Sequence, residues 1–155
     1  MDEVVAVLEL LADDGSLTGE GIGAVLERLG WGVARQVPGA AFARVWRKND
    51  LLAGIEGDAP QVRLAVTLWE REVDEEAGFD ALEALYDESA QVVGRIAHEV
   101  ETGVLAGRLV RPDGGRTQGI DYIEQRAWVL GRRSLLVGAV QDDTELPVRV
   151  DAVVS

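Results

Sequence analysis

The order in which the hydrophobic pattern changes its period constrains the fold of this chain more than any other feature. Residues 2–12 and 18–29 place apolar side chains three and four positions apart, which is the spacing of amphipathic helices. Residues 31–70 then alternate between apolar and polar positions, as strands do, and a third helical pattern follows at 80–101. Alternation returns at 121–154. Strands therefore come in two blocks around one long helix.

This order predicts an α+β protein and argues against a doubly wound nucleotide-binding fold, in which strands and helices alternate. Short loops within each block favour antiparallel pairing. We expect a mainly antiparallel sheet of about six strands, with two N-terminal helices and the long helix packed on it. Pro147 opens the last strand, and a proline there favours an edge position. No linker or repeat divides the chain, so residues 1–155 are expected to form a single domain.

The pattern at 80–101 separates apolar from polar residues almost completely. Its apolar side carries Leu82, Leu85, Tyr86, Val92, Val93, Ile96, Ala97 and Val100. Its polar side carries Asp80, Glu83, Asp87, Glu88, Gln91, Arg95 and His98. Asp80 and Glu83 have the spacing of a capping box, with Asp80 as the N-cap. We expect this helix to lie on the sheet with its polar side in water.

The charge of the chain restricts its partners. The sequence has 28 acidic and 15 basic residues, for a formal net charge of −13. Such a protein repels nucleic acid phosphates and anionic lipid headgroups, so a basic protein is the natural complement, although the charge is also explained by solubility alone. The acidic start is unlike a signal peptide, and no apolar run is long enough to span a membrane. We expect a cytoplasmic monomer or homodimer.

No group of residues predicts catalysis, a cofactor or a metal site. The chain has no cysteine, which excludes disulfides and thiolate ligands. Its acidic loops do not match calcium-binding spacing, and the glycines of residues 19–23 do not fit a phosphate-binding pattern. His98, the only histidine, lies on the polar side of the long helix with Arg95 and Glu101 as helical neighbours. We therefore expect a protein that is not an enzyme.

The acids of the long helix are the first candidate for a partner-binding surface. This acidic stripe consists of Asp80, Glu83, Asp87 and Glu88. Like charges at helical spacing destabilise a helix by about 0.2–0.5 kcal/mol per pair. Asp80 and Glu83 recover some of this from the helix dipole, whereas Asp87 and Glu88 lie beyond its reach. The stripe is therefore kept for a partner or tolerated for solubility.

A second acidic group is the other charged candidate for partner binding. It consists of Asp142, Asp143 and Glu145, in the loop between the last two strands. The alternative interpretation is a polar turn in which an aspartate side chain bonds to backbone amides.

Trp69 is the aromatic candidate for a partner anchor. Strict alternation in "VTLWE" places it on the same face as Arg63 and Thr67, which makes it the best candidate for exposure among the tryptophans. Tryptophan is enriched among the residues that dominate interface energetics. The alternative is that it packs in the core or is half-buried, as tryptophans usually are.

The C-terminal third, "RAWVLGRRSLLVGAVQDDTELPVRVDAVV", resembles the end of small acidic immunity-type proteins of actinobacteria that are encoded with polymorphic toxin systems. The shared features are a tryptophan-bearing strand, a short basic turn, an apolar strand ending at Gln141–Asp142, and Glu145–Leu146–Pro147 before a valine-rich strand. The resemblance implies binding and blocking of a toxin domain, and it assigns no contact residue.

Two functions follow as hypotheses. The first is an immunity or inhibitor protein that neutralises a basic toxin domain through its acidic face. The alternative is a secretion-chaperone-like binding protein that uses an outer sheet face and dimerises. An enzyme or small-ligand binder would require a polar pocket, for example around His98 or Arg126.

Overall fold

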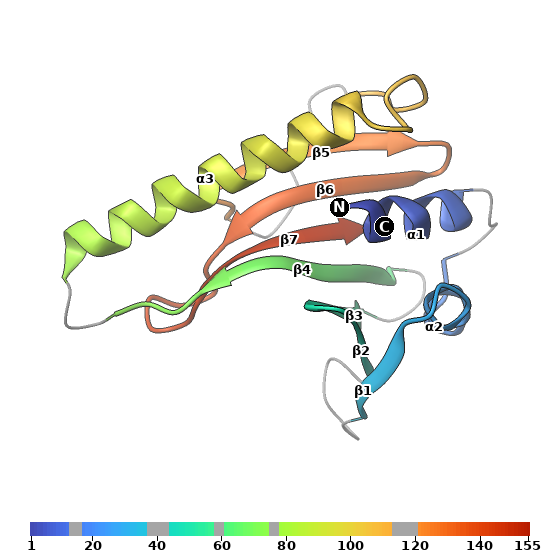
Figure 1. Ribbon diagram of the computed structural model, residues 1–155, viewed down its shortest axis with the longest axis horizontal. Coiled ribbons are helices and arrows are strands. Elements are labelled where there is room, and N and C mark those ends of the chain that lie inside the picture. Colours follow the sequence, from blue (N-terminus) through green and yellow to red (C-terminus); the bar gives the residue numbers. More distant parts are fainter. Residues whose placement is uncertain (13–16, 37–43, 58–60, 75–77, 113–120) are drawn as a thin grey trace.

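A seven-stranded antiparallel sheet runs through the part of the chain that the structure describes, with helices packed on one of its faces (Figure 1). The computed structural model describes residues 1–12, 17–36, 44–57, 61–74, 78–112 and 121–155. Within these ranges the chain forms three helices and seven strands. It is an α+β protein, as the order of hydrophobic periods predicts, with one strand more than the expected number of about six.

Two blocks of neighbouring strands make up the sheet. The strands are β1 Gly32–Gln36, β2 Arg44–Lys48, β3 Leu51–Glu56, β4 Arg63–Arg71, β5 Glu124–Leu130, β6 Arg133–Val140 and β7 Val148–Val154. Their order across the sheet is β1-β2-β3-β4-β7-β6-β5. The first block is thus a meander of β1 to β4, the second is a meander of β5 to β7, and the pairing of β4 with β7 joins them.

The central place of β7 contradicts the prediction that Pro147 holds the last strand at an edge. β7 pairs with β4 on one side and with β6 on the other. Pro147 precedes Val148, the first residue of the strand, and Val148 already pairs with Arg71. Because the proline lies outside the ladder, its missing N–H removes no hydrogen bond from the sheet.

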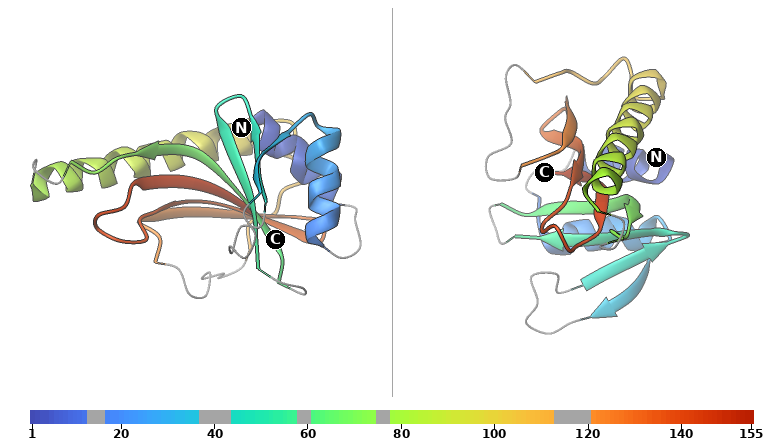
Figure 2. Two further views of the ribbon diagram at one scale, coloured as in Figure 1. Left: turned by 90° about the horizontal axis from the view of Figure 1, so that it is seen from below. Right: turned by 90° about the vertical axis from the view of Figure 1, so that its left-hand side faces the viewer.

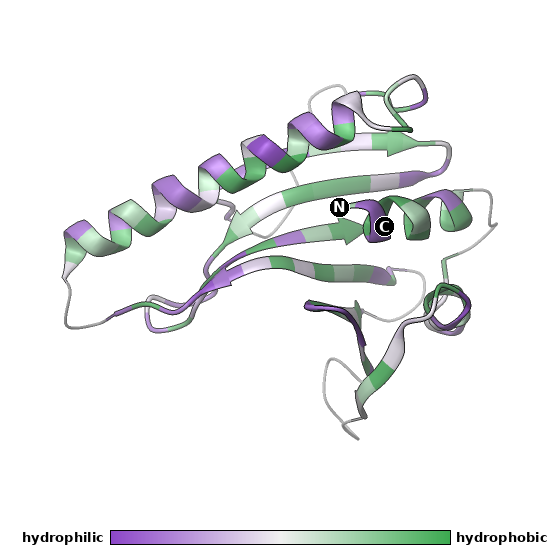
Figure 3. Ribbon diagram, viewed as in Figure 1, coloured by the Kyte–Doolittle hydropathy of each residue, from purple (hydrophilic) through white to green (hydrophobic). Residues whose placement is uncertain are grey.

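The helices are α1 (Asp2–Ala12), α2 (Gly19–Arg28) and α3 (Phe79–Thr102). α3 packs across β5, β6 and β7, while α1 packs against α2 and β6 (Figures 1 and 2). The apolar side of α3 faces the sheet and its polar side faces solvent, as predicted. Figure 3 shows hydrophilic and hydrophobic residues mixed along α3, whereas β6 is hydrophobic over most of its length.

Close contacts fix the N-terminal helices to the first block of strands. A Cβ at Gly23 of α2 would lie 3.2 Å from the ring of Trp46, so the glycine lets the helix approach that buried indole. Lys48 of β2 donates a hydrogen bond to the Leu29 carbonyl at 2.7 Å and pairs with Glu3 of α1 at 2.6 Å. One strand residue therefore holds both helices.

Helix ends agree with local sequence signals in α2 and differ in α3. Thr18 caps α2 by accepting a hydrogen bond from the Gly21 N–H at 3.0 Å, and Gly30 follows the helix with φ 81°. The prediction that Asp80 caps α3 is wrong, because Gly78 occupies the N-cap position with φ 77° and no side-chain hydrogen bond. Asp80 lies instead in the first turn, where the helix dipole still favours an anion.

The opposite face of the sheet carries no helix among the described residues, and we call it the open face (Figure 2). In β4, Leu64 and Val66 point to the helices, so Ala65 and Thr67 point to the open face. β2 and β3 run steeply across the direction of β4–β7 in Figure 2, as expected from sheet twist. The open face is therefore concave where the two blocks meet.

Candidate functional site

The acidic stripe of α3 stands in solvent as predicted. Asp80, Glu83, Asp87 and Glu88 are all exposed. None of these four carboxylates forms a salt bridge with another residue in the described ranges. At 1.5 Å of rise per residue, the stripe extends over about 12 Å of the helix. Within the described part of the chain, the stripe is therefore a run of exposed carboxylates that no ion pair neutralises.

An apolar groove of about 300 Å³ runs beside the stripe, between α3 and the segment that leaves β4. It is lined by Glu72, Val73, Asp74, Ala81, Leu82, Ala84, Leu85 and Glu88. Glu88 thus belongs to both the groove and the acidic stripe. Phe79, at the start of α3, is 70% exposed. Apolar surface and carboxylates therefore lie next to each other at this end of the helix.

Gln141 makes several of the side-chain hydrogen bonds in the turn between β6 and β7. The Gln141 amide donates hydrogen bonds to the carbonyls of Thr144 and Leu146, and its oxygen accepts one from Tyr86 of α3 at 2.6 Å. The predicted binding residues of this turn, Asp142, Asp143 and Glu145, are all exposed. Only Asp142 among these three forms an ion pair with a described residue, at 2.9 Å from Arg149.

The predicted orientation of Trp69 is wrong. The ladder between β4 and β7 shifts register between Thr67 and Trp69, so that Thr67 pairs with Asp151 but Trp69 pairs with Val150. Val150 lies on the helix-covered face, and Trp69 is half-buried against the same core. One extra residue in β4 therefore turns Trp69 away from the open face, where strict alternation would have placed it.

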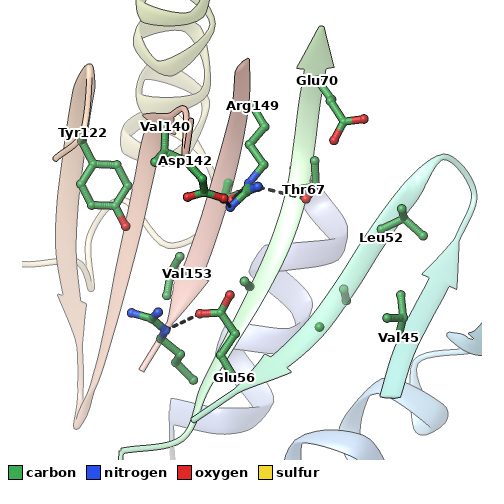
Figure 4. Close-up of a pocket in the computed structure, with 15 residues that line it drawn as sticks. Val45, Leu52, Glu56, Thr67, Glu70, Tyr122, Val140, Asp142, Arg149 and Val153 are labelled. Atoms are coloured by element: carbon green, nitrogen blue, oxygen red, sulfur yellow. Dashed lines mark hydrogen bonds and ion pairs between the residues drawn. The ribbon is translucent and has the colours of Figure 1, made fainter. Parts of the chain in front are cut away.

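The concave part of the open face contains a hollow of about 400 Å³ (Figure 4). Its residues come from β2, β3, β4, β6 and β7, from the turn between β6 and β7, and from the segment before β5. The apolar part of the lining includes Val45, Leu52, Ala65, Val140 and Val153. The polar part consists of Glu56, Arg63, Thr67, Glu70, Tyr122, Asp142, Arg149 and Asp151.

A chain of polar contacts crosses the floor of the hollow. The Thr67 hydroxyl donates to Asp151 at 2.9 Å, and Arg149 donates to Asp151 at 2.8 Å and to Asp142 at 2.9 Å. Burial alone would lower the pKa of Arg149, but the hydrogen bond and charge of Asp151, then those of Asp142, outweigh it and raise that pKa. The guanidinium is therefore firmly held as a cation. Across the hollow, Arg63 pairs with Glu56.

Tyr122 forms one wall of the hollow and covers Gly138. A Cβ at Gly138 would lie 2.4 Å from the Tyr122 ring, so only glycine allows this contact without movement of the ring. The Tyr122 hydroxyl points toward the hollow in Figure 4. Burial raises the pKa of Tyr122 above its usual value, so the group is a neutral hydrogen-bonding phenol at neutral pH.

Glu101, at the end of α3, has a structural environment. Its carboxylate accepts hydrogen bonds from Arg111 at 2.6 Å and from the buried Trp128 indole at 3.3 Å. The hydrogen bond from Arg111 lowers the pKa of Glu101, against a smaller opposing effect of desolvation. The carboxylate thus satisfies the indole N–H of Trp128.

His98 lies at a shallow, open depression on the outer side of α3. The depression is lined by Glu88, Gln91, Gly94, Arg95, His98 and Glu99, which all belong to α3, so it is open to solvent and is not enclosed by other elements. Arg126 is exposed and pairs with Glu124 on its own strand. Among the described residues, no three His, Asp or Glu side chains are arranged to hold a metal ion.

Sequence reasoning missed the hollow, although it identified Asp142 at its rim. Thr67 and Asp151 are 84 positions apart, and their contact depends on which strands pair. A signal does exist in "VRVDAVV", where Arg149 and Asp151 replace apolar residues on one face of an otherwise hydrophobic strand. Opposite charges two positions apart on a valine-rich strand indicate a polar network on that face.

Comparisons with protein-family models, with curated proteins and with solved structures find no match to this chain. In the described part of the chain, no helix combines the length and the apolar character that crossing a membrane requires.

Proposed function

We propose that this chain is a non-catalytic protein-binding protein that docks a basic partner against the acidic stripe. The observation that carries this proposal is that four exposed carboxylates on α3 have no ion pair among the described residues. Like charges at this spacing repel each other and weaken the helix that bears them. A cationic surface placed over the stripe would remove that repulsion.

The net charge of −13 supports the same direction of attraction. A field of this sign guides a basic protein toward the molecule and raises the association rate more than the final affinity. Exposed charges are screened over about 8 Å at physiological ionic strength, so this attraction depends strongly on salt.

The groove beside the stripe offers the apolar contact that charge alone does not provide. Glu88 lies at its rim, and exposed Phe79 stands at the start of the same helix. Stable interfaces combine a desolvated apolar centre with a polar rim, and aromatic residues are enriched in them. A partner that presents a basic, amphipathic segment fits this combination.

The resemblance of the C-terminal third to immunity-type proteins narrows the proposed partner to a toxin domain. Binding would inhibit the toxin by covering the basic surface that it uses for its activity. This chain would not need to catalyse a reaction. The proposed function is therefore that of an immunity or inhibitor protein for a basic toxin domain.

The test begins with capture of the partner from the native host and its identification. Association is then followed by stopped-flow fluorescence between about 0.01 M and about 1 M salt, where the screening length falls from about 30 Å to about 3 Å. The association rate should fall by at least about tenfold across this range. Co-expression of this chain should also suppress the toxicity of the captured domain.

A matched pair of variants separates the stripe from net charge. One variant neutralises the stripe with Asp80→Asn, Glu83→Gln, Asp87→Asn and Glu88→Gln. The control neutralises four other exposed acids with Asp2→Asn, Glu20→Gln, Glu27→Gln and Asp50→Asn. Only the first variant should lose both fast association and protection. Equal rates at low and high salt, or equal losses in the two variants, would contradict the proposal.

The second candidate, a secretion-chaperone-like protein, rests on the open face. The hollow there supports it, but the orientation of Trp69 removes the aromatic anchor that this hypothesis had assigned to that face. Proteins of that type dimerise, so sedimentation of the purified chain separates the two functions. A monomer at all concentrations would count against the chaperone-like function.

A further inference from the structure

The hollow on the open face is separate from the acidic stripe and from the groove beside it, because it lies on the opposite side of the sheet. We infer that this hollow is a binding site for an organic cation carried on an aliphatic stem, that is, an alkylammonium or alkylguanidinium group. The inference rests on the volume, charge and lining of the hollow, and it does not depend on the proposed function.

The size and shape of the hollow suit a small ligand or a single long side chain. Its volume of about 400 Å³ lies within the range of small-molecule sites, which is roughly 300–1,000 Å³. Its floor is the centre of the sheet, where β4 and β7 pair from Leu64–Val154 to Arg71–Val148 with one register shift between Thr67 and Trp69. Functional groups held on paired strands are better fixed than groups on loops.

The charges of the hollow select a cation. The lining contains four carboxylates, from Glu56, Glu70, Asp142 and Asp151, and two guanidinium groups, from Arg63 and Arg149. Each guanidinium is already paired with a carboxylate of the hollow, and Arg149 is shared by two of them. An anion would therefore find no unpaired cation and would meet a surplus of negative charge.

Two carboxylates at the rim remain available for the ligand. Glu70 is exposed and forms no salt bridge with a described residue. Asp142 has a side chain that is 52% exposed, and Arg149 keeps Asp151 as its partner if Asp142 turns toward the ligand. Glu70 and Arg149 are direct cross-strand neighbours, so Glu70 stands beside the Arg149–Asp142 pair.

The remaining lining suits the stem of such a ligand. Apolar surface in the hollow comes from Val45, Leu52 and Val153. Methylene groups of the ligand can pack against this surface, as the methylene groups of lysine and arginine side chains pack against apolar surface in proteins. The Tyr122 hydroxyl directed toward the hollow adds one neutral hydrogen-bonding group. The site therefore combines apolar side chains with the polar network of its floor and the carboxylates of its rim.

An alkylammonium or alkylguanidinium group can come from a free organic cation or from a basic side chain of a partner protein. The experiment uses agmatine and 1,5-diaminopentane as free cations, and an acetylated, amidated Gly-Arg-Gly peptide for the side chain. Pentanol serves as the neutral control and glutarate as the anionic control. Binding to the full chain is followed by amide chemical shifts in two-dimensional NMR.

We expect shifts that cluster at β4 and β7, including Thr67 and Asp151, with cations and not with pentanol or glutarate. Stronger binding of agmatine or diaminopentane than of the peptide would identify a free cation as the ligand, and the reverse would identify a side chain. No shift up to about 10 mM of any cation, where a millimolar ligand would fill most sites, would overturn the inference.

Two variants of equal charge complete the test. Glu70→Gln with Asp142→Asn should weaken cation binding about fivefold, which corresponds to two partly exposed ion pairs. Asp80→Asn with Asp87→Asn removes the same charge from the acidic stripe and should leave binding unchanged. Equal weakening by both pairs would show attraction by net charge alone and would also overturn the inference. Thermal unfolding of both variants verifies that the fold is kept.

Discussion

Removal of Arg149 gives the sharpest test of the polar network that crosses the sheet. In the parent chain, Arg149 contacts Asp151 at 2.8 Å and Asp142 at 2.9 Å. Arg149→Met keeps an unbranched apolar stem in place but leaves Asp151 with Thr67 as its neutral hydrogen-bond donor. The Asp151 side chain is only 11% exposed, so its carboxylate cannot recover full hydration.

The magnitude follows from the exposure of the three side chains. Breaking a fully buried ion pair by removing one partner destabilises a protein by about 3–5 kcal/mol. The Arg149 side chain is 31% exposed, so we expect about 2–3 kcal/mol, or a fall in melting temperature of about 5–10 °C. Asp142 is 52% exposed, and Asp142→Asn should lower stability by less than about 1 kcal/mol.

Urea unfolding followed by tryptophan fluorescence measures these differences in the free energy of unfolding. An unchanged dependence of that free energy on urea concentration would show that the compactness of the folded and unfolded states is unchanged. Asp151→Asn in the Arg149→Met background removes the unpaired charge, so the double variant should be more stable than additivity predicts, by about 1–2 kcal/mol. Strict additivity, or equal losses from Arg149→Met and Asp142→Asn, would refute the view that Asp151 is a buried anion held by Arg149.

Three further predictions concern other parts of the fold. Gly94→Ala should stabilise the chain by about 0.5–1 kcal/mol in urea unfolding, because Gly94 is exposed within α3 and has no atom within 4 Å of an added Cβ. Gly138→Ala should destabilise it by about 1–3 kcal/mol, because its Cβ would overlap the Tyr122 ring, and Tyr122→Ala should remove most of this loss. Glu101→Gln should lower stability at neutral pH. Because Arg111 lowers the pKa of Glu101 from its ordinary value of 4.5, that difference should shrink as pH falls below 4.5 in a series of unfolding curves, and a constant difference would contradict this origin.

Features that depend on neighbouring residues could be predicted from the sequence. The bounds of α1, the Thr18 cap of α2 and the exposed stripe of α3 all follow from spacing and side-chain chemistry within one or two helical turns. The alternation of β7, and that of β4 as far as Thr67, also follows from neighbouring residues. The α+β class followed because the two strand blocks and the long helix are each strongly periodic.

Features that depend on which strands pair could not be predicted. A proline indicates an edge strand only if it lies within the hydrogen-bonded ladder of the sheet. Pro147 lies outside the ladder, just before Val148, and this becomes clear only when the pairing of β7 with β4 is known. The polar network has the same origin, because Thr67 and Asp151 meet only when β4 and β7 are neighbours.

The register shift between Thr67 and Trp69 in β4 links these observations. It adds one residue to β4 that the sequence pattern does not reveal, and it changes which side chains lie on the open face. Without it, Thr67 and Trp69 would share that face and Glu70 would point into the core. With it, Trp69 packs on the helix side against Val150, while Glu70 stands on the open face opposite Arg149. The shift therefore exchanges an aromatic side chain for a carboxylate at the rim of the hollow. The open face is for this reason better suited to a cation than to the aromatic anchoring that strict alternation suggests.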